Sequence, residues 1–286
     1  MAQTKHDIRC LLAEAGIVPR RRLGQHFMID QNLLRLVVEA GEVTDGDWVL
    51  EVGPGTGALT EQLLQVAGRV VAVELDRNLA SFLRGRLSGN ARFSLIQGDA
   101  LCGKHKLNAQ VLKAMESAAQ QGLTRKLVAN LPYNIACPLI IDLLMAGMDV
   151  LAFSVQKEVA QRLVAGAGHK SYGPLSVMAQ LLSKPEILRT MPPEAFWPRP
   201  KVESALVVMH RENQLGERAG EFSRFLQRLF SVRRKTLRNA LARVHDDGES
   251  VLRACGMNGK IRAEELTPAQ LLELFETVRG QNPEAT

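Results

Sequence analysis

The amino-acid sequence predicts an α/β fold, in which a seven-stranded, mostly parallel sheet is followed by a small all-α domain. Short apolar runs alternate with amphipathic segments from Trp48 onward, as in a parallel sheet with helices on both faces. A glycine-rich turn joins the first of these runs to the helix after it. Beyond the polar stretch at 211–220 the pattern is purely helical. We therefore expect one domain over residues 1–212 and a helical domain over 213–286.

The composition is that of a folded protein in a reducing compartment. Hydrophobic residues make up 46% of the 286 residues and charged residues 23%, which argues against a disordered chain. No apolar run approaches the roughly 18 residues of a membrane span, and no secretory leader is recognisable. The cysteines fit neither a disulfide scaffold nor a zinc site, because they are far apart, at Cys10, Cys102, Cys137 and Cys255. We expect a cytoplasmic protein with no metal and no membrane partner.

The elements are expected in a regular order. The basic residues 1–29 show no strong periodicity, and Asp30 is then the expected N-cap of a helix that ends near Gly41. Strands are expected at 48–52, 70–75, 93–97, 127–130, 150–155, 186–190 and 205–210. Helices are expected at 58–67, 77–87 and 139–147, and after the sheet at 221–230, 233–244, 249–255 and 267–279. A polar, helical insertion at 105–124 separates two strands and is expected to lie away from the motifs.

A glycine-rich loop follows the first strand. Gly53, Gly55 and Gly57 alternate with other residues, so the backbone can turn tightly and approach a ligand closely. The spacing G-x-G-x-G, with Pro54 inside it, differs from the G-x-G-x-x-G of dinucleotide sites. Glu51 would repel a diphosphate but suits the cationic end of S-adenosylmethionine. The loop therefore favours this cofactor over NAD, and an NAD-type oxidoreductase is the less favoured alternative.

Acidic residues follow the next two strands. Glu74 lies 21 residues after Gly53, where a carboxylate can accept both ribose hydroxyls of an adenosine. Asp99, between Gly98 and Ala100, could accept a hydrogen bond from the adenine amine. Taken alone, the first could be a solvated strand end and the second an Asp turn. Together with the glycine loop they predict an adenosine pocket at the carboxyl edge of the sheet.

The tetrapeptide Asn130-Leu131-Pro132-Tyr133 follows the fourth strand. It resembles the [Asn/Asp]-Pro-Pro-[Tyr/Phe] signature of methyltransferases that act on amines of planar rings. The lone pair of such an amine is delocalised, and two acceptors, the Asn130 side-chain oxygen and the Leu131 carbonyl, would localise it. Pro132 stiffens the turn, and Tyr133 offers a stacking surface for an extruded base, worth about 1–3 kcal/mol. Without the glycine loop, these residues would be an ordinary strand-to-helix turn.

Basic residues gather in two places, and the net charge is +6. The four-residue spacing of Arg224 and Arg228, and of Arg234 and Arg238, would place charges on common helix faces that follow a phosphate backbone. Charge runs are more often only solvated faces, so this signal is weak alone. The candidates for RNA binding are Arg20, Arg21, Arg22, Arg233, Arg234, Lys235 and Arg238.

With these motifs in order, the sequence resembles the ribosomal RNA adenine dimethyltransferase family over nearly its whole length. The matching stretches are L-G-Q-H-F-M from Leu23, E-V-G-P-G-T-G-A-L-T from Glu51, E-L-D from Glu74, G-D-A-L from Gly98, N-L-P-Y-N-I from Asn130, Q-K-E-V-A-Q-R-L from Gln156, Y-G-P-L-S-V from Tyr172, P-P-E-A-F-W-P-R-P-K-V-E-S-A from Pro192 and R-R-K-T-L-R-N-A-L from Arg233. The chain departs from the family at His26 and Met28, where Asn and Leu are usual, and in its longer insertion at 105–124.

The resemblance implies a Rossmann-like class I methyltransferase fold with a helical rRNA-docking domain. Tyr133 and Phe196 would hold the target adenine between their rings. The implied substrate is a pair of adjacent adenosines in the hairpin loop near the 3′ end of small-subunit rRNA, each dimethylated by a monomer that binds the immature subunit. The residues that would close or contact the S-adenosylmethionine site are Gln25, His26, Met28, Glu51, Gly53, Gly55, Glu74, Leu75, Asp99, Ala100 and Asn130.

Two other functions stay open at this point. One is a related methylase that modifies large-subunit rRNA and confers macrolide resistance; N-L-P-Y-N-I from Asn130 and Y-G-P-L-S-V from Tyr172 favour the small-subunit enzyme. The other is a non-catalytic RNA-binding assembly or transcription factor on the same fold. The intact Glu74, Asp99 and N-L-P-Y motif argue against a loss of chemistry.

Overall fold

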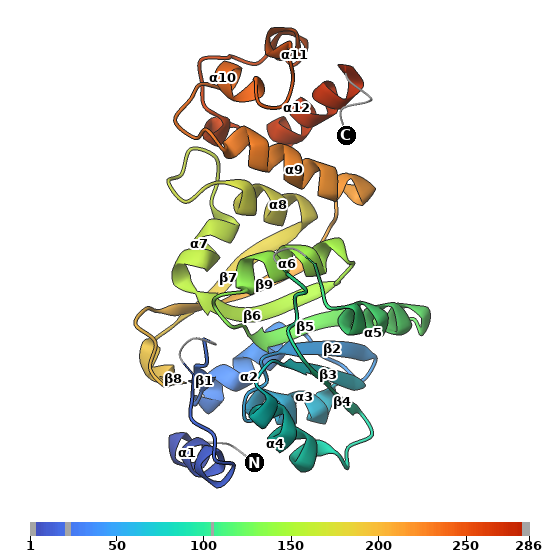
Figure 1. Cartoon of the computed structure of the whole chain (residues 1–286), viewed down its shortest axis with the longest axis vertical. Helices are drawn as coiled ribbons and strands as arrows, with labels where there is room; N and C mark the ends of the chain where they lie inside the picture. The colour runs from blue at the N-terminus through green and yellow to red at the C-terminus, as the bar shows by residue number, and fades with distance from the viewer. Residues whose placement is uncertain (1–3, 21–23, 104–105, 282–286) are drawn as a thin grey trace. The chain divides into compact units, whose positions relative to one another are not determined.

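The computed structural model describes residues 4–20, 24–103 and 106–281, and the chain forms two compact units (Figure 1). The first unit contains the residues up to Ala160 together with Pro185–Arg211, and the second contains Gln161–Lys184 and the residues from Glu212 onward. The boundary expected from sequence, at 212/213, places residues 161–184 in the first domain, whereas the structure places them in the second unit. They join the second unit because α8 (Pro174–Leu182) contacts α9 (Ala219–Phe230) and α12 (Pro268–Gln281).

The first unit is built around a seven-stranded sheet in the order β4-β3-β2-β5-β6-β9-β7. Its strands are β2 (Asp47–Val52), β3 (Arg69–Glu74), β4 (Phe93–Gln97), β5 (Thr124–Asn130), β6 (Val150–Gln156), β7 (Ser183–Met191) and β9 (Ser204–Arg211). The pairs among β2 to β6 are parallel, and β9 pairs antiparallel with β6. The predicted sheet is confirmed. Its strands were recognisable because those buried on both faces are nearly continuous apolar runs.

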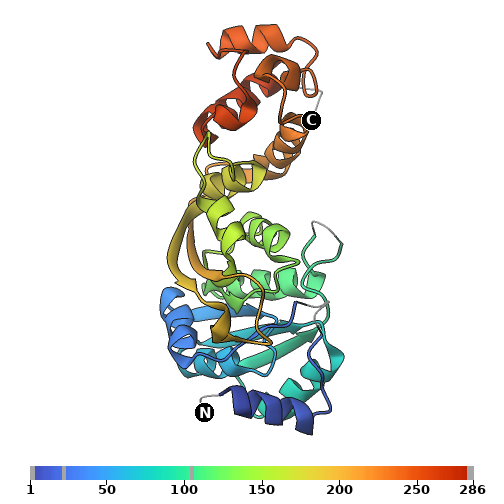
Figure 2. The ribbon, with the colours of Figure 1, turned by 90° about the vertical axis from the view of Figure 1, so that its left-hand side faces the viewer.

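Helices cover both faces of the sheet. α2 (Gln31–Ala40), α3 (Ala58–Val66) and α4 (Arg77–Leu87) contribute to one apolar core with β2 and β3. Figure 2 shows α5 (Ala109–Gln120) and α6 (Ala136–Met145), in green, on the opposite side of the sheet from α2 and α3, in blue. α7 (Lys157–Val164) follows β6 directly. Asp30 caps α2 as predicted, because its carboxylate accepts the backbone N–H groups of Asn32 and Leu33.

The N-terminal region forms a helix and a short strand that were not predicted from the sequence. Residues 1–29 lack strong periodicity, yet α1 (Lys5–Glu14) forms, because Thr4 and Asp7 make a reciprocal capping box. β1 (Phe27–Met28) pairs antiparallel with β8 (Phe196–Trp197), which follows the short helix η2 (Pro193–Ala195). Strands of two residues are too short to show an alternating pattern, so they could not be predicted from the sequence. The apolar face of α1 packs in a small core made of Ile8, Leu12, Ile17, Phe27 and Leu79.

The second unit consists mainly of helices, within the ranges that the structure describes. Its elements after residue 212 are η3 (Gly216–Arg218), α9 (Ala219–Phe230), α10 (Leu237–Leu241), α11 (Gly248–Ala254), η4 (Ala263–Glu265) and α12 (Pro268–Gln281). The helices predicted at 221–230, 249–255 and 267–279 are confirmed. Among the described residues, no helix combines the length and apolar character needed to span a membrane.

The helix predicted at 233–244 is too long at both ends, because α10 spans only Leu237–Leu241. The segment before α10 forms turns, in which the Arg233 guanidinium donates to the Tyr172 carbonyl and to the Glu264 carboxylate. These bonds favour non-helical turns before α10 over a longer helix. Arg234 and Arg238 therefore do not project from a common helix face, whereas Arg224 and Arg228 are both exposed on α9.

A buried ion pair joins β2 to β5 within the sheet. The Lys126 ammonium lies 3.0 Å from the Asp47 carboxylate, and the two side chains are only 8% and 5% exposed. Lys126 also donates to the Glu42 carbonyl, and Asp47 accepts from the backbone N–H and the hydroxyl of Thr44. Taking two charges out of water is costly, so the pair depends on these additional hydrogen bonds.

We expect Lys126→Met to lower the free energy of unfolding by about 3 kcal/mol, because Asp47 then stays buried without its counter-charge. Urea denaturation measures the change. The matched control is Lys157→Met, which removes the exposed pair with Glu203 and should cost less than about 1 kcal/mol. Equal losses in the two variants would contradict the assigned importance of the buried pair.

Candidate functional site

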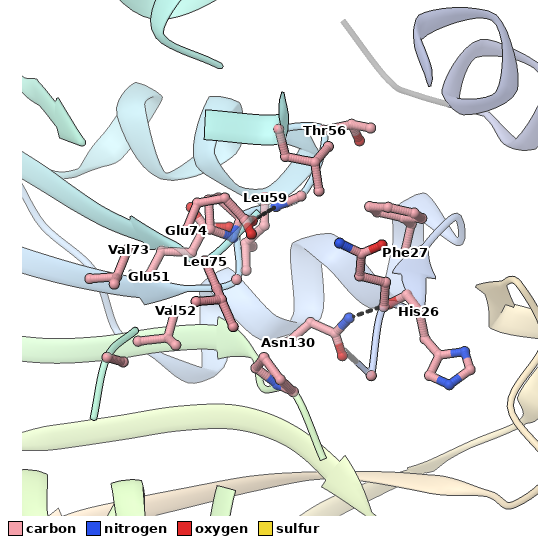
Figure 3. A pocket seen from close by; sticks show the side chains of 18 of the residues that line it. His26, Phe27, Glu51, Val52, Thr56, Leu59, Val73, Glu74, Leu75 and Asn130 are labelled. Carbon is pink, nitrogen blue, oxygen red and sulfur yellow. Dashed lines mark hydrogen bonds between the residues drawn. The ribbon is translucent and has the colours of Figure 1, made fainter. Parts of the chain in front are cut away.

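A pocket opens at the carboxyl edge of the sheet in the first unit (Figure 3). Its walls are the ends of β2, β3 and β5, the loop after β4, and residues 24–28 of the N-terminal arm. It contains about 960 Å³ of space free of protein atoms, the open solvent at its mouth included. All the residues that the sequence assigns to the cofactor line this pocket: Gln25, His26, Met28, Glu51, Gly53, Gly55, Glu74, Leu75, Asp99, Ala100 and Asn130.

The glycine loop lies directly against the pocket. Gly53, Gly55 and Gly57 have φ values of 75°, 60° and 85°, a region that residues with a Cβ rarely adopt. A Cβ on Gly55 would lie 2.7 Å from the Phe27 ring, and a Cβ on Gly53 would lie 3.1 Å from Pro132. The missing side chains therefore let the N-terminal arm and the N-L-P-Y turn approach the loop.

Glu51 is a buried carboxylate in the floor of the pocket. It is 2% exposed, and the Thr60 hydroxyl donates to it at 2.6 Å. In the described ranges no lysine or arginine forms an ion pair with it. Burial raises the pKa of Glu51 to about 8, and the neighbouring Glu74 carboxylate acts in the same direction. A ligand that brings positive charge to this position would restore the ionised form.

Glu74 ends β3 and is also buried, with 5% of its surface exposed. Its two oxygens accept the backbone N–H groups of Gly55, at 3.2 Å, and Asp76, at 2.8 Å. These bonds fix the carboxylate, but burial outweighs them and raises the pKa of Glu74 to about 7. Its burial excludes the reading of a solvated strand end. Each oxygen retains a lone pair, which suits the paired hydroxyls of a ribose.

Asp99 forms the Asp turn that the sequence left open, and it still faces the pocket. One carboxylate oxygen accepts the Leu101 N–H at 3.0 Å, and the residue lines the pocket beside Ala100. The insertion reaches this turn, so the expectation that it lies away from the motifs is wrong. The Asn108 side chain donates to the Asp99 carbonyl at 2.8 Å, and its backbone N–H donates to the Ala100 carbonyl. The start of the insertion thus supports this wall.

Asn130 stands at the end of β5, on the same edge as the two glutamates. Its amide nitrogen donates to the His26 carbonyl at 2.7 Å, and its oxygen accepts the Ser154 hydroxyl (Figure 3 shows the first bond). Leu131 is 1% exposed, and its N–H donates to the Ser154 carbonyl at 3.1 Å. Asn130 and Pro132 line the pocket. The turn is therefore held by contacts from both the arm and β6.

Tyr133 and Phe196 lie beside the pocket and do not line it. The Tyr133 ring stacks on His26, with centroids 5.6 Å apart, and its hydroxyl is 2.6 Å from that of Ser204. Burial raises the pKa of Tyr133. Phe196 is 2% exposed and belongs to the main core with Met28. In the described residues the two rings make no contact with each other, and their joint role with a target base stays a prediction.

Residues 24–28 of the N-terminal arm form one wall of the pocket. Gln25 accepts the Arg20 N–H at 2.7 Å and donates to the Asp76 carboxylate at 3.4 Å. The His26 ring points away from the two glutamates (Figure 3), and its Nδ1 donates to the Pro198 carbonyl at 2.6 Å. His26 thus offers the pocket its backbone while its ring contacts Tyr133.

The basic candidates differ in their surroundings. Arg20 is exposed and lies 3.7 Å from Asp76, whereas Arg21 and Arg22 fall outside the described residues. Arg233 and Arg238 form ion pairs with Glu264 and Glu249. The exposed side chains of Arg234 and Lys235 form no ion pair with any residue that the structure describes. Among the seven candidates, these two are the described cations that are exposed and have no acidic partner.

Four residues without an assignment from sequence belong to the site. The Phe27 ring covers Gly55, Thr60 binds Glu51, Asn108 supports Asp99, and Ser154 binds Asn130. Phe27 stands in the motif L-G-Q-H-F-M and could have been suspected. The polar three could not, because their contacts depend on tertiary approach of separate elements.

The pocket fits S-adenosylmethionine. The three glycines of the loop let its backbone approach a ligand, the buried Glu51 carboxylate favours a cation, and Glu74 and Asp99 offer acceptors for ribose and adenine. Among the described residues, no cluster of His, Cys, Asp and Glu could hold a metal ion.

Sequence comparison identifies relatives over nearly the whole chain. The family profile described as "Ribosomal RNA adenine dimethylase" matches residues 18–279. Ribosomal RNA small subunit methyltransferase A of Magnetococcus marinus is 41% identical over 275 residues, which cover 94% of this chain and 95% of that protein. The protein of the same name from Moorella thermoacetica is 35% identical over 277 residues, covering 94% and 96%.

Solved structures share the fold. A dimethyladenosine transferase from Plasmodium falciparum superposes with a TM-score of 0.70 at 22% identity, covering 90% of this chain and 98% of that one. The 23S rRNA methyltransferase ErmE gives a TM-score of 0.63 at 25% identity, covering 88% and 99%. The predicted class I methyltransferase fold is confirmed. The chain belongs to the ribosomal RNA adenine dimethylase family and is an S-adenosylmethionine-dependent rRNA methyltransferase.

Proposed function

We propose that this enzyme dimethylates two adjacent adenosines in the hairpin loop near the 3′ end of small-subunit rRNA, acting as a cytoplasmic monomer on the immature subunit. The observation that carries the proposal is the Asn130 amide, held at the pocket edge opposite the two buried glutamates. The small-subunit assignment is supported by the names of the relatives with 41% and 35% identity.

Different residues of the pocket would bind the cofactor and activate the target amine. S-adenosylmethionine supplies a methyl group on a positively charged sulfur, which makes that methyl electrophilic. Glu74 and Asp99 hold the adenosine part, and Glu51 attracts the cationic part. The Asn130 oxygen and the Leu131 carbonyl accept the protons of the target amine, which localises the nitrogen lone pair. No strong base is required, because the nitrogen becomes acidic once it carries the new methyl group.

The target base has to leave its stack to reach these acceptors. Tyr133 supplies a stacking surface next to Asn130, and its hydroxyl is anchored on Ser204. Because His26 lies against the Tyr133 ring, the imidazole either moves aside or becomes part of the surface that the base meets. Arg234 and Lys235 are the first candidates for phosphate contacts, which hold RNA without reading its sequence.

Activity on large-subunit rRNA is the second candidate, since the structure of ErmE superposes over 88% of this chain. The two substrates can be separated directly. Undermethylated small subunits and deproteinised large-subunit rRNA are incubated in parallel with the enzyme and labelled S-adenosylmethionine. Mass spectrometry of rRNA fragments should locate dimethyladenosines in the small-subunit hairpin. Label in large-subunit rRNA alone would overturn the small-subunit assignment.

We expect Asn130→Ala to reduce methyl transfer by about 100-fold, as when one of two groups that stabilise a transition state is lost. Affinity for the RNA should change less than twofold, because the phosphate contacts are elsewhere. Filter binding and single-turnover transfer of labelled methyl groups measure the two quantities. An Asn130→Ala variant with wild-type transfer would instead favour a scaffold on which the N-L-P-Y turn has no chemical role.

Cofactor affinity should rise with pH between about 6 and 8.5. Ionised Glu74 and Glu51 suit the cofactor, but their pKa values of about 7 and 8 leave them protonated at low pH. Below these values each group has to lose its proton on binding, which weakens affinity by up to about tenfold per pH unit. Calorimetry in buffers of different ionisation enthalpy should therefore detect proton release.

Glu74→Gln is the control for this pH dependence. It removes one titrating group, so its affinity should be lower at pH 8.5 and should vary less with pH than that of the wild type. S-adenosylhomocysteine, which lacks the sulfonium charge, separates the effect of charge from that of the ribose contacts. A wild-type affinity that is flat from pH 6 to 8.5 would rule out a proton-linked carboxylate in this pocket.

A further inference from the structure

Ser154 has no assignment from sequence, although it touches two successive residues of the N-L-P-Y turn. It lies in β6 directly opposite Asn130 in the parallel register with β5, and it is fully buried. Its hydroxyl donates to the Asn130 side-chain oxygen, and its backbone carbonyl accepts the Leu131 N–H at 3.1 Å. One residue thus contacts the group proposed to bind the target amine and the peptide that follows it.

The direction of the Asn130 amide is determined by its two partners. The His26 carbonyl can only accept, so the amide nitrogen has to face it, at 2.7 Å. The amide oxygen then faces Ser154, whose hydroxyl is the donor of the pair. An amide oxygen has two lone pairs, and Ser154 occupies one of them. The second lone pair is left for a donor on the pocket side.

We propose that Ser154 is a positioning residue for methyl transfer. Its hydroxyl holds the Asn130 oxygen at the angle at which its second lone pair meets the amine of the target base. Without it, the amide would be held only through its nitrogen and could rotate about that contact. The proposal rests on the proposed function of Asn130 as an acceptor for the amine.

A merely structural hydroxyl would behave differently. Ser183 provides the comparison, since it is 1% exposed and its hydroxyl donates to the Ala179 carbonyl of the preceding helical turn. Such a contact satisfies a buried donor and touches no residue of the pocket. The Ser154 hydroxyl instead reaches across to another strand and ends on a pocket-lining side chain.

The test compares Ser154→Ala with the matched control Ser183→Ala. The rate of single-turnover methyl transfer should fall about tenfold in Ser154→Ala, the effect of losing one orienting hydrogen bond, and should stay within about twofold in Ser183→Ala. Affinities for RNA and for S-adenosylhomocysteine should stay within about twofold of wild type in both. Thermal unfolding checks that both variants are folded. Ser154→Cys, which keeps a weak donor, should recover part of the rate.

A double-mutant cycle with Asn130→Ala separates positioning from general destabilisation. If Ser154 acts through Asn130, adding Ser154→Ala to Asn130→Ala should cause no further loss of rate. Losses that multiply, or a Ser154→Ala rate within twofold of wild type, would overturn the proposal. The rates are measured on whichever rRNA the wild type methylates. A wild type inactive on small subunits but active on large-subunit rRNA would therefore refute the proposed substrate and leave the Ser154 test intact.

Discussion

The site depends on the parallel register of three neighbouring strands. β2, β3 and β5 end at the same edge of the sheet, and each delivers one polar side chain there: Glu51, Glu74 and Asn130. Side chains alternate between the two faces of a strand, so a shift of one residue would turn any of them out of the pocket. These strands are nearly continuous apolar runs because the sheet is covered on both faces.

The pocket combines two buried carboxylates with a loop in which every second residue is glycine. In the free protein this arrangement is electrostatically unfavourable, and the raised pKa values of Glu51 and Glu74 express that cost. A cationic ligand with hydroxyl donors removes it. The same pocket would disfavour a diphosphate, which agrees with the argument from the glycine spacing against NAD.

The sheet and the glycine loop could be predicted from local patterns at strand ends. The residues that the sequence assigned to the cofactor all line one pocket, and their contacts with a cofactor stay a prediction. The prediction from sequence missed α1, whose only signal is the Thr4–Asp7 capping box. It also made α10 too long, because the residues before this helix are held in turns by the side-chain contacts of Arg233. It could not foresee the stacking of His26 on Tyr133 or the bond from Ser154 to Asn130. Those contacts join elements far apart in the chain, and only the folded backbone brings them together.

The insertion at 105–124 is hydrogen-bonded to the pocket wall near its beginning and is exposed to solvent near its end. Asn108 ties it to the wall of the pocket, whereas residues 119–122, at the end of α5, are exposed to solvent. Substitutions, fused peptides or a fluorophore at 119–122 would leave the Asp99 turn untouched. Residues 119–122 therefore offer an attachment point for a reporter, whereas the preceding part of α5 is held by its buried side chains Val111, Met115 and Ala118.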